Sequence, residues 1–481
     1  MKAFSSLREI KNQISAGQTS CRDLVVYYLQ NIESNRHLGA FLEVYAQDAL
    51  QRAEQIDQKI QAGSAGRLAG AVIGIKDVFC YADHPLQCAS QILDGFRSQF
   101  TATAIQRLLE EDAIIIGRQN CDEFAMGSSC ENSSFGPVRN ALDPELVPGG
   151  SSGGSAVAVQ ADMCLISIGS DTGGSVRQPA AFCGIKGLKP SYSRISRHGL
   201  AAYASSFDCV GILAKNIEDI ALCLEIMAGA DEYDSTVSST EVPRYSQMLD
   251  FDRKSKIVYI EETVNSDKLQ PEVKELFFEQ LDWLRTQGHE IKSIHIPLLN
   301  YILPVYYILT TAEASSNLAR YDGVRYGFRA KQNTHANKSV NQLIEMYKKS
   351  RSEGFGAEVK RRILLGTFVL SADYYDAYYT KAQKIRRLLK DETDKILNDN
   401  DFIVMPTTPT TAFKIGAHAQ DPVQMYLEDL YTVQANVVGI PAISVPIGKD
   451  KAGMPIGFQI MTGIFKEAEL LAFSNYLLEN K

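Results

Sequence analysis

Residues 147–178 read VPGGSSGGSAVAVQADMCLISIGSDTGGSVRQ and are the most informative part of the sequence. Two clusters of serine and glycine flank an apolar run, and Ser151 and Ser175 lie 24 positions apart, one in each cluster. Repeated glycine weakens regular structure and indicates backbone that turns sharply or closely approaches a ligand. A serine hydroxyl beside exposed backbone N–H groups is what acyl transfer requires, because the nucleophile then lies next to donors for the developing oxyanion. The stretch therefore favours acyl-transfer chemistry.

Along the rest of the chain, segments with helical periodicity alternate with short apolar runs. The pattern predicts an α/β fold in which a central mixed sheet is covered by helices on both faces. We expect a single domain over 1–481, with its core at about 65–215 and a helix-rich cover at about 300–372. Helices are predicted over 5–15, 20–34, 43–61, 102–112, 157–161, 216–227, 271–287, 373–398 and 465–479. Strands are predicted over 71–75, 113–117, 164–169, 256–260, 290–296, 402–406, 441–447 and 456–461.

Composition narrows the class of protein. The chain has 481 residues, of which 45% are hydrophobic, and its formal net charge of −8 argues against a surface that wraps a nucleic-acid backbone. Its nine cysteines form no CxxC pair, so neither a disulfide framework nor a zinc site is expected. No apolar run approaches the roughly 20 residues that a membrane-spanning helix needs. We therefore expect a cytoplasmic enzyme without a metal and without membrane contact.

Two other motifs compete with this interpretation of the serine clusters. The first cluster satisfies GxSxG in two frames, centred on Ser151 and on Ser152, and in α/β-hydrolases that motif follows a strand. Here it follows a loop that contains Pro148, and none of the downstream histidines has a distinctive context, so a Ser–His hydrolase is disfavoured. A Walker loop is excluded because GxxxxGK[ST] is absent.

Lys76 is the candidate base. It directly follows the apolar run AVIGI, which is predicted to be a buried strand, so its ammonium can be buried away from water. A lysine accepts a serine proton only when it is neutral, so its pKa must fall from ~10.4 toward ~7. Each unit of pKa shift corresponds to ~1.4 kcal/mol, so burial or nearby dipoles must destabilise the charged form of Lys76 by several kcal/mol. A lone lysine at a strand end is more often one that extends its ammonium to solvent, and spacing alone does not identify the partner of Lys76.

The sequence resembles the amidase signature family in three blocks: GIKD at 74–77, PGGSSGGSAVAVQAD at 148–162 and SDTGGSVRQPAAFCGIKGLKPSY at 170–192. The resemblance implies a Ser–Ser–Lys triad with Lys76 as base, Ser151 as a bridging serine preceded by a cis peptide bond, and Ser175 as nucleophile. It also implies an oxyanion hole made by the backbone N–H groups of Thr172, Gly173, Gly174 and Ser175. Cys130 is an alternative nucleophile, although a buried structural cysteine is its commoner role.

Beyond these blocks, the chain resembles the family of A subunits of glutamyl/aspartyl-tRNA amidotransferases nearly end to end. The supporting stretches are 122–140, 313–327, 351–368, 371–388 and 421–446. This resemblance implies a glutaminase in a heterotrimer with a B and a C subunit (GatB and GatC). Ammonia released from glutamine would amidate Glu-tRNA(Gln) or Asp-tRNA(Asn). The chain itself would hold no cofactor, while ATP and Mg²⁺ would be used by the B subunit, which would also make most of the contact with tRNA.

The same resemblance suggests how a free amino acid is bound. The α-carboxylate of glutamine needs a cation and its α-ammonium needs an anion, since burying either charge unpaired is costly. We assign these to Arg362 and Asp429, with Arg361 as the alternative cation. Ser128 and a tyrosine of the pair Tyr306 and Tyr307 would complete the pocket.

Two other functions remain open: a free-standing amidase of a small carboxamide, and a non-catalytic scaffold of the same fold. The intact residues Lys76, Ser151 and Ser175 argue against the scaffold.

Overall fold

The structure is a computed structural model that describes residues 3–331, 340–418, 426 and 428–480. Residues 332–339 of the predicted cover, and residues 421–425 and 427 of the last resembling stretch, lie outside the described residues. Within the described part of the chain, no helix combines the length and the apolar character that crossing a membrane requires.

Eleven strands form one mixed sheet in the order β1-β3-β2-β4-β6-β5-β10-β11-β9-β7-β8. Parallel pairs occur at both ends of the sheet, as in β2 with β3 and β4, and β7 with β8 and β9. The middle of the sheet, from β4 through β9, is antiparallel. The strands are β1 (Phe41–Val44), β2 (Val72–Lys76), β3 (Ile114–Gln119), β4 (Ile166–Asp171), β5 (Lys186–Lys189), β6 (Cys209–Ala214), β7 (Lys256–Ile260), β8 (Glu290–Ile294), β9 (Phe402–Pro406), β10 (Ala442–Lys449) and β11 (Pro455–Met461).

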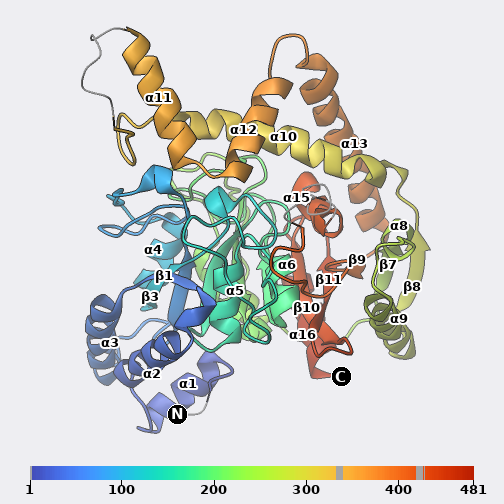
Figure 1. Cartoon of the computed structure of the whole chain (residues 1–481). Coiled ribbons are helices and arrows are strands. Elements are labelled where there is room, and N and C mark those ends of the chain that lie inside the picture. The colour runs from blue at the N-terminus through green and yellow to red at the C-terminus, as the bar shows by residue number, and fades with distance from the viewer. Residues whose placement is uncertain (1–2, 332–339, 419–425, 427, 481) are drawn as a thin grey trace.

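Helices cover both faces of the sheet, which confirms the predicted α/β class. α5 and α6 contact each other and strands of the central sheet that include β4, β5, β10 and β11. α7 and α16 also contact each other, and they lie against β6, β10 and β11. α10, α12 and α13 form a separate layer across one end of the molecule (Figure 1). The helices are α1 (Leu7–Ser15), α2 (Cys21–Ser34), α3 (Ala46–Gln61), α4 (Thr103–Glu110), α5 (Gly153–Gln160), α6 (Arg177–Cys183), α7 (Ile217–Met227), α8 (Glu261–Val264), α9 (Pro271–Thr286), α10 (Ile302–Asn317), α11 (Val340–Gly354), α12 (Ala357–Val369), α13 (Lys381–Asp399), α15 (Val433–Val438) and α16 (Glu467–Glu479).

Two predicted helices start too early. Residues 43–44 belong to β1, because Val44 pairs with Gly117 of β3 across an antiparallel register that local periodicity does not reveal. The helix predicted from residue 373 begins as a π-helix at Asp376–Thr380 and becomes α13 only at Lys381. The wider turn fits a segment whose residues 371–378 are all exposed, so few packing contacts enforce α-helical geometry there.

Candidate active site

Lys76 is the last residue of β2, and its side chain is fully buried among three serine hydroxyls. The Nζ atom lies 2.7 Å from Ser151 Oγ, 3.0 Å from Ser152 Oγ and 3.0 Å from Ser170 Oγ. Burial lowers the pKa of the Lys76 ammonium, against the opposing effect of nearby acidic groups that include Asp122. The desolvated lysine predicted at the end of this strand is therefore present.

The two serine clusters meet beside this lysine. The peptide bond between Gly150 and Ser151 is cis, as the family resemblance implies. The backbone N–H of Ser152 donates to the carbonyl of Ser175 at 3.0 Å, which joins the first cluster to the second. The first cluster lies between a loop and the start of α5 rather than after a strand, and no described histidine bonds to its serines. The geometry therefore differs from that of an α/β-hydrolase.

When Lys76 is neutral, the hydrogen bonds around it are suited to proton transfer from Ser151. The Ser152 hydroxyl donates to the carbonyl oxygen of Ser170 at 3.1 Å, so it can only accept from Lys76. A neutral lysine has two N–H groups and one lone pair, and Ser152 and Ser170 provide acceptors for the two N–H groups. The lone pair is then left for Ser151, the nearest of the three hydroxyls. This arrangement is suited to drawing a proton from Ser151.

Ser175 ends a short loop between β4 and α6 and is 7% exposed. Within the described residues, the backbone N–H groups of Thr172, Gly173 and Ser175 have no acceptor, which leaves them available to an oxyanion. Gly174 departs from the prediction, because its N–H donates to Asp171 Oδ1 at 2.9 Å. Three of the four predicted donors are therefore free.

Neither Gly173 nor Gly174 can be replaced by a residue with a side chain, because other residues lie too close. A Cβ atom on Gly173 would collide with the hydroxyl of Tyr306, and one on Gly174 would collide with the side chain of Thr432. Gly174 also has a φ of 128°, which an L side chain rarely adopts. The Thr432 hydroxyl donates to the carbonyl of Gly173 at 2.6 Å. The loop is thus enclosed by residues from distant parts of the sequence.

A buried ion pair holds the loop from behind. Asp171 and Arg177 are both fully buried, and Arg177 Nη2 lies 2.9 Å from Asp171 Oδ1. Burial alone raises the pKa of Asp171, but the charge and hydrogen bonds of Arg177 outweigh it and bring the pKa to about 2. Arg177 also donates to the carbonyl of Thr432 and to the side chains of Gln459 and Asn436. Sequence patterns did not assign this pair, although both residues stand inside the second serine block.

Arg362 occupies the layer of helices above the loop. Its side chain is 5% exposed, and its guanidinium lies over the rings of Tyr203, Tyr307 and Tyr426 at 5.6, 5.5 and 5.7 Å. It donates to Tyr203 Oη at 2.7 Å and pairs with Glu358 at 2.8 Å. The side chain of the alternative residue, Arg361, is 49% exposed. Of the two arginines, only Arg362 faces inward.

Tyr307 links Asp429 to Arg362: its ring lies under the Arg362 guanidinium, and its hydroxyl donates to the Asp429 carboxylate. Burial raises the pKa of Asp429 to about 7, although the hydrogen bond from Tyr307 and the charge of Arg362 act in the opposite direction. The carbonyl of Asp429 accepts a hydrogen bond from the backbone N–H of Thr432 at 3.1 Å. Through Thr432, the segment of Asp429 is attached to the loop of Ser175.

The remaining predicted residues lie around the same loop. Tyr306 approaches Gly173, and its ring is 5.1 Å from that of Tyr307. Ser128 is buried in the loop that packs against Gly150. The structure therefore brings the serine clusters, Tyr306, Tyr307, Arg362 and Asp429 into one region.

Sequence reasoning missed two adjacent carboxylates that connect the parts of this region. Asp122 accepts hydrogen bonds from the N–H groups of Cys130 and Asn132, and its carboxylate lies where a Cβ on Gly150 would be. Glu123 accepts from the N–H of Gly356, the residue that caps α12. Burial raises the pKa of Asp122 to about 6 and that of Glu123 to about 7. The available signal was a pair of acidic residues in an otherwise apolar and small-residue stretch, DEFAMGSS.

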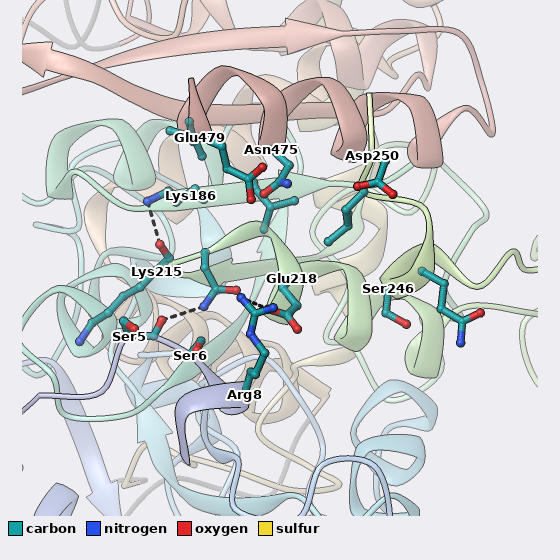
Figure 2. A pocket seen from close by; sticks show the side chains of 15 residues that line it. Ser5, Ser6, Arg8, Lys186, Lys215, Glu218, Ser246, Asp250, Asn475 and Glu479 are labelled. Atoms are coloured by element: carbon teal, nitrogen blue, oxygen red, sulfur yellow. Dashed lines mark hydrogen bonds and ion pairs between the residues drawn. The ribbon is translucent and has the colours of Figure 1, made fainter. Parts of the chain in front are cut away.

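A polar cavity of about 520 Å³ lies elsewhere, between the starts of α1 and α7 and the end of α16 (Figure 2). Some of its polar groups bond to one another: Arg8 pairs with Glu218, and Lys186 donates to the carbonyl of Lys215. None of the predicted site residues lines it. Among the described residues, no cluster of three or more His, Cys, Asp or Glu side chains is suited to a metal ion.

Comparison with known proteins gives consistent results. A family model described as Amidase matches residues 23–471. The chain is 48% identical to the A subunit of glutamyl-tRNA(Gln) amidotransferase from Chlorobium luteolum, covering 98% of this chain and 97% of the relative. The corresponding protein of Chlorobaculum tepidum is 47% identical, with 98% of both chains covered.

Solved structures show the same fold. The A subunit of glutamyl-tRNA(Gln) amidotransferase from Thermotoga maritima is 36% identical, with a TM-score of 0.77 over 96% of this chain and 93% of that one. A chain of an inhibitor-bound vestigial protein complex, which reveals the evolutionary origins of an s-triazine catabolic enzyme, is 27% identical. Its TM-score is 0.86 over 100% of this chain and 98% of that one.

Proposed function

The chain belongs to the amidase family, and on that premise we propose that it is the glutamine-hydrolysing A subunit of a tRNA-dependent amidotransferase. The near full-length similarity to A subunits supports this choice within the family. The structural observation behind it is the pairing of a buried lysine–serine cluster with two opposite charges, Arg362 and Asp429, next to the same loop. A zwitterionic amino acid matches that charge pattern.

In the proposed acylation step, Ser175 Oγ attacks the side-chain carboxamide carbon of glutamine. Its proton passes to Ser151 Oγ, while the proton of Ser151 passes to the neutral Nζ of Lys76. The carbonyl oxygen becomes an oxyanion that accepts hydrogen bonds from the N–H groups of Thr172, Gly173 and Ser175. When the C–N bond breaks, the proton returns through Ser151 to the departing nitrogen, which leaves as ammonia.

Deacylation reverses the roles of the same groups. A water molecule loses its proton through Ser151 to Lys76 as it attacks the glutamyl ester on Ser175. The same backbone donors stabilise the second oxyanion, and the ester bond breaks to release glutamate. Ser175 Oγ then recovers a proton through Ser151. Lys76 is neutral at the start and the end of each step, which is why its lowered pKa matters.

The substrate is held by groups above the loop. Arg362 offers a guanidinium that binds a carboxylate, and Asp429 offers the countercharge to an ammonium. Arg362 is already paired with Glu358 and enclosed by three tyrosine rings, so its position is fixed before the substrate arrives. Ser128, Tyr306 and Tyr307 complete the proposed pocket.

The second half of the reaction belongs to partner subunits in this proposal. A B subunit would use ATP and Mg²⁺ to activate Glu-tRNA(Gln) or Asp-tRNA(Asn), and ammonia from this chain would complete the amidation. A C subunit would complete the heterotrimer. We place the complex in the cytoplasm, because its acceptor would be an aminoacyl-tRNA.

A coupling experiment tests this function. Ser175→Ala in the assembled complex is expected to abolish glutamine-dependent amidation of misacylated tRNA, while ammonium chloride restores amidation because it bypasses glutamine hydrolysis. Ser238→Ala is the matched control and is expected to retain both activities, because the Ser238 hydroxyl bonds to Thr240 and not to the predicted site residues. A free-standing amidase has no second reaction to restore. If the Ser175 variant assembles and binds tRNA but fails with ammonia, the proposed division of labour is wrong.

A further inference from the structure

A short turn before β6 contacts both parts of the candidate site. Residues 203–208 lie in the connection between β5 and β6, and the side chains of Tyr203 and Asp208 are buried. The Asp208 carboxylate accepts hydrogen bonds from the backbone N–H groups of Tyr203 and Ala204, at 3.0 and 3.1 Å. The backbone N–H of Asp208 donates to the carbonyl of Ala204 at 2.9 Å. These bonds close the turn, so its first and last residues are held together.

The last residue of the turn reaches the loop of Ser175. Thr172 follows β4 and Asp208 precedes β6, and the antiparallel register that pairs Asp171 with Cys209 places these two residues side by side. The Thr172 hydroxyl donates to Asp208 Oδ1 at 2.7 Å. Burial raises the pKa of Asp208 to about 6, which leaves it mostly charged at pH 7, and a hydrogen bond to a carboxylate is stronger than one between neutral groups. The bond fixes the residue whose backbone N–H is proposed to bind the oxyanion.

The first residue of the turn reaches the proposed binding group for the substrate carboxylate. Tyr203 Oη accepts a hydrogen bond from Arg362 Nη1 at 2.7 Å, and the Arg362 guanidinium lies 5.6 Å from the centre of the Tyr203 ring. The Tyr203 hydroxyl donates to Thr310 Oγ1 at 3.2 Å, and the Thr310 hydroxyl donates to the carbonyl of Tyr306 at 2.8 Å. Tyr306 in turn approaches Gly173. The turn is therefore connected to the loop of Ser175 by two routes.

We infer that Tyr203 and Asp208 are positioning residues that hold the Arg362 guanidinium and the Thr172 backbone N–H in a fixed relation to each other; this inference rests on the proposed function. Neither residue is assigned a contact with glutamine, because Tyr203 acts through Arg362 and Asp208 acts through Thr172. A carboxylate bound at Arg362 restrains Tyr203 and, through the turn, Thr172. Binding at the amino-acid end of the substrate then contributes to the rate of cleavage at its carboxamide end.

The turn also has packing contacts that do not depend on the hydroxyls of Tyr203 and Thr172. The ring of Phe207 lies 6.0 Å from that of Tyr306, edge to face, and the Arg386 guanidinium lies 4.1 Å from the centre of the Phe207 ring. Removal of one hydroxyl should therefore leave the turn folded. A turn with only a packing role would then change neither kcat nor KM, which separates the two roles experimentally.

The test measures kcat and KM for glutamine hydrolysis by the assembled complex. Thr172→Val keeps the shape of the side chain but removes its bond to Asp208, and it is expected to lower kcat about 10–100-fold with little change in KM. Thr172→Ser keeps a hydroxyl and should recover most of the lost kcat. Thr462→Val is the matched control, because Thr462 is also buried and its hydroxyl donates to the carbonyl of Asp401 at 2.8 Å, at the end of β11.

Tyr203→Phe removes the hydroxyl at the other end of the turn. It is expected to raise KM about tenfold and also to lower kcat about threefold, although Tyr203 is assigned no contact with the reacting atoms. Tyr245→Phe is its control, since the buried Tyr245 hydroxyl donates to Glu467 at 3.4 Å. The loss of kcat/KM in the double variant, Thr172→Val with Tyr203→Phe, should be at least about threefold smaller than the product of the two single losses. Circular dichroism of each free chain verifies folding.

The possible outcomes separate this inference from the proposed function. If the unmodified complex does not hydrolyse glutamine, the proposed function fails. If it does, and the loss in the folded double variant equals the product of the single losses, the positioning inference is overturned. It is also overturned if Thr172→Ser is as slow as Thr172→Val, or if Tyr203→Phe raises KM and leaves kcat unchanged.

Discussion

The centre of the sheet and the layer of helices above it build the candidate site in different ways. Lys76, Ser151, Ser170 and Ser175 come from within 100 residues of one another, at the ends of β2 and β4 and the starts of α5 and α6. Arg362 and Asp429 come from the later part of the chain and are positioned by aromatic rings and a tyrosine hydroxyl. The first group is held by hydrogen bonds within residues 76–175, and the second by contacts of Arg362 and Asp429 with tyrosine side chains from other segments.

This difference separates reaction from recognition. Changes in the sheet region should reduce the rate of bond cleavage or the stability of the fold. Changes in the helical layer should mainly alter the affinity for glutamine. Four substitutions, taken in order of decreasing expected effect, test whether reaction and recognition are separate in this way.

Lys76→Arg is expected to lower kcat by up to about 10⁴-fold, because a guanidinium stays protonated and cannot accept the proton of Ser151. Glutamine hydrolysis by the assembled complex measures kcat and KM separately, and KM should change little. Lys189→Arg is a suitable control, since Lys189 is also buried but its ammonium donates to the carbonyl of Pro190, away from the serines. Substantial turnover by the Lys76 variant would show that only the positive charge is needed.

Arg177→Met is expected to destabilise the chain by about 3–5 kcal/mol, because it leaves Asp171 buried without its countercharge. The depressed pKa of Asp171 means that its carboxylate stabilises the fold above its unfolded pKa of ~3.9, and that this contribution is lost as pH falls through about 2. Chemical denaturation at pH 7 measures the change. Arg387→Met, at a 75% exposed arginine, should cost less than ~1 kcal/mol; equal losses for the two would contradict the assigned role of the buried pair.

Arg362→Lys is expected to lower kcat/KM about 10–100-fold, mostly through KM, because an ammonium cannot form the same paired hydrogen bonds or stack on the three rings. Arg361→Lys is the matched control in the adjacent position and should have little effect. The two variants distinguish the arginines that sequence reasoning left as alternatives. A larger effect at Arg361 would reverse the assignment.

Asp429 is expected to give the KM for glutamine a pH dependence. Its raised pKa of about 7 means that it is mostly charged at pH 8 and mostly protonated at pH 6, so KM should rise about tenfold between these values as pH falls. Asp429→Asn should raise KM and remove this dependence. The kcat profile reports Lys76 separately, since its protonation at low pH stops the reaction. A variant that retains the pH dependence of KM would point to another titrating group.

Sequence patterns located the sheet region more completely than the helical layer. The strand before Lys76 and the two serine clusters were expected, because each depends on residues close together in the chain, while the cis bond before Ser151 was expected only from the family resemblance. The family resemblance favoured Arg362 over Arg361, but local patterns could not decide between them, since their orientation depends on how α12 packs against α10 at Gly366. The strands β1, β5 and β6 were missed for the same reason, because their pairings with β3, β10 and β4 join distant parts of the chain.

The connecting groups were the least predictable. These groups bond to backbone N–H groups or to neighbouring side chains, and no local sequence pattern predicts such bonds. They are Asp122, Glu123, Ser170 and Asp171. The loop of residues 172–175 was also predicted incompletely for this reason. Four N–H groups were expected to be free, and the carboxylate of Asp171 occupies the one on Gly174.

The contacts of Arg177 also determine how late in synthesis the loop of Ser175 gains its supports. Arg177 binds Asn436 and Gln459, which follow it by 259 and 282 positions, and β5 beside it pairs with β10 from the end of the chain. At ~5–20 residues per second, a ribosome needs roughly 15–60 s after adding Arg177 to supply Gln459. Throughout that interval the loop of Ser175 lacks its supports and an inner strand has an open edge. A nascent chain is therefore expected to lack the folded loop of Ser175 until residues 436–459 have been made.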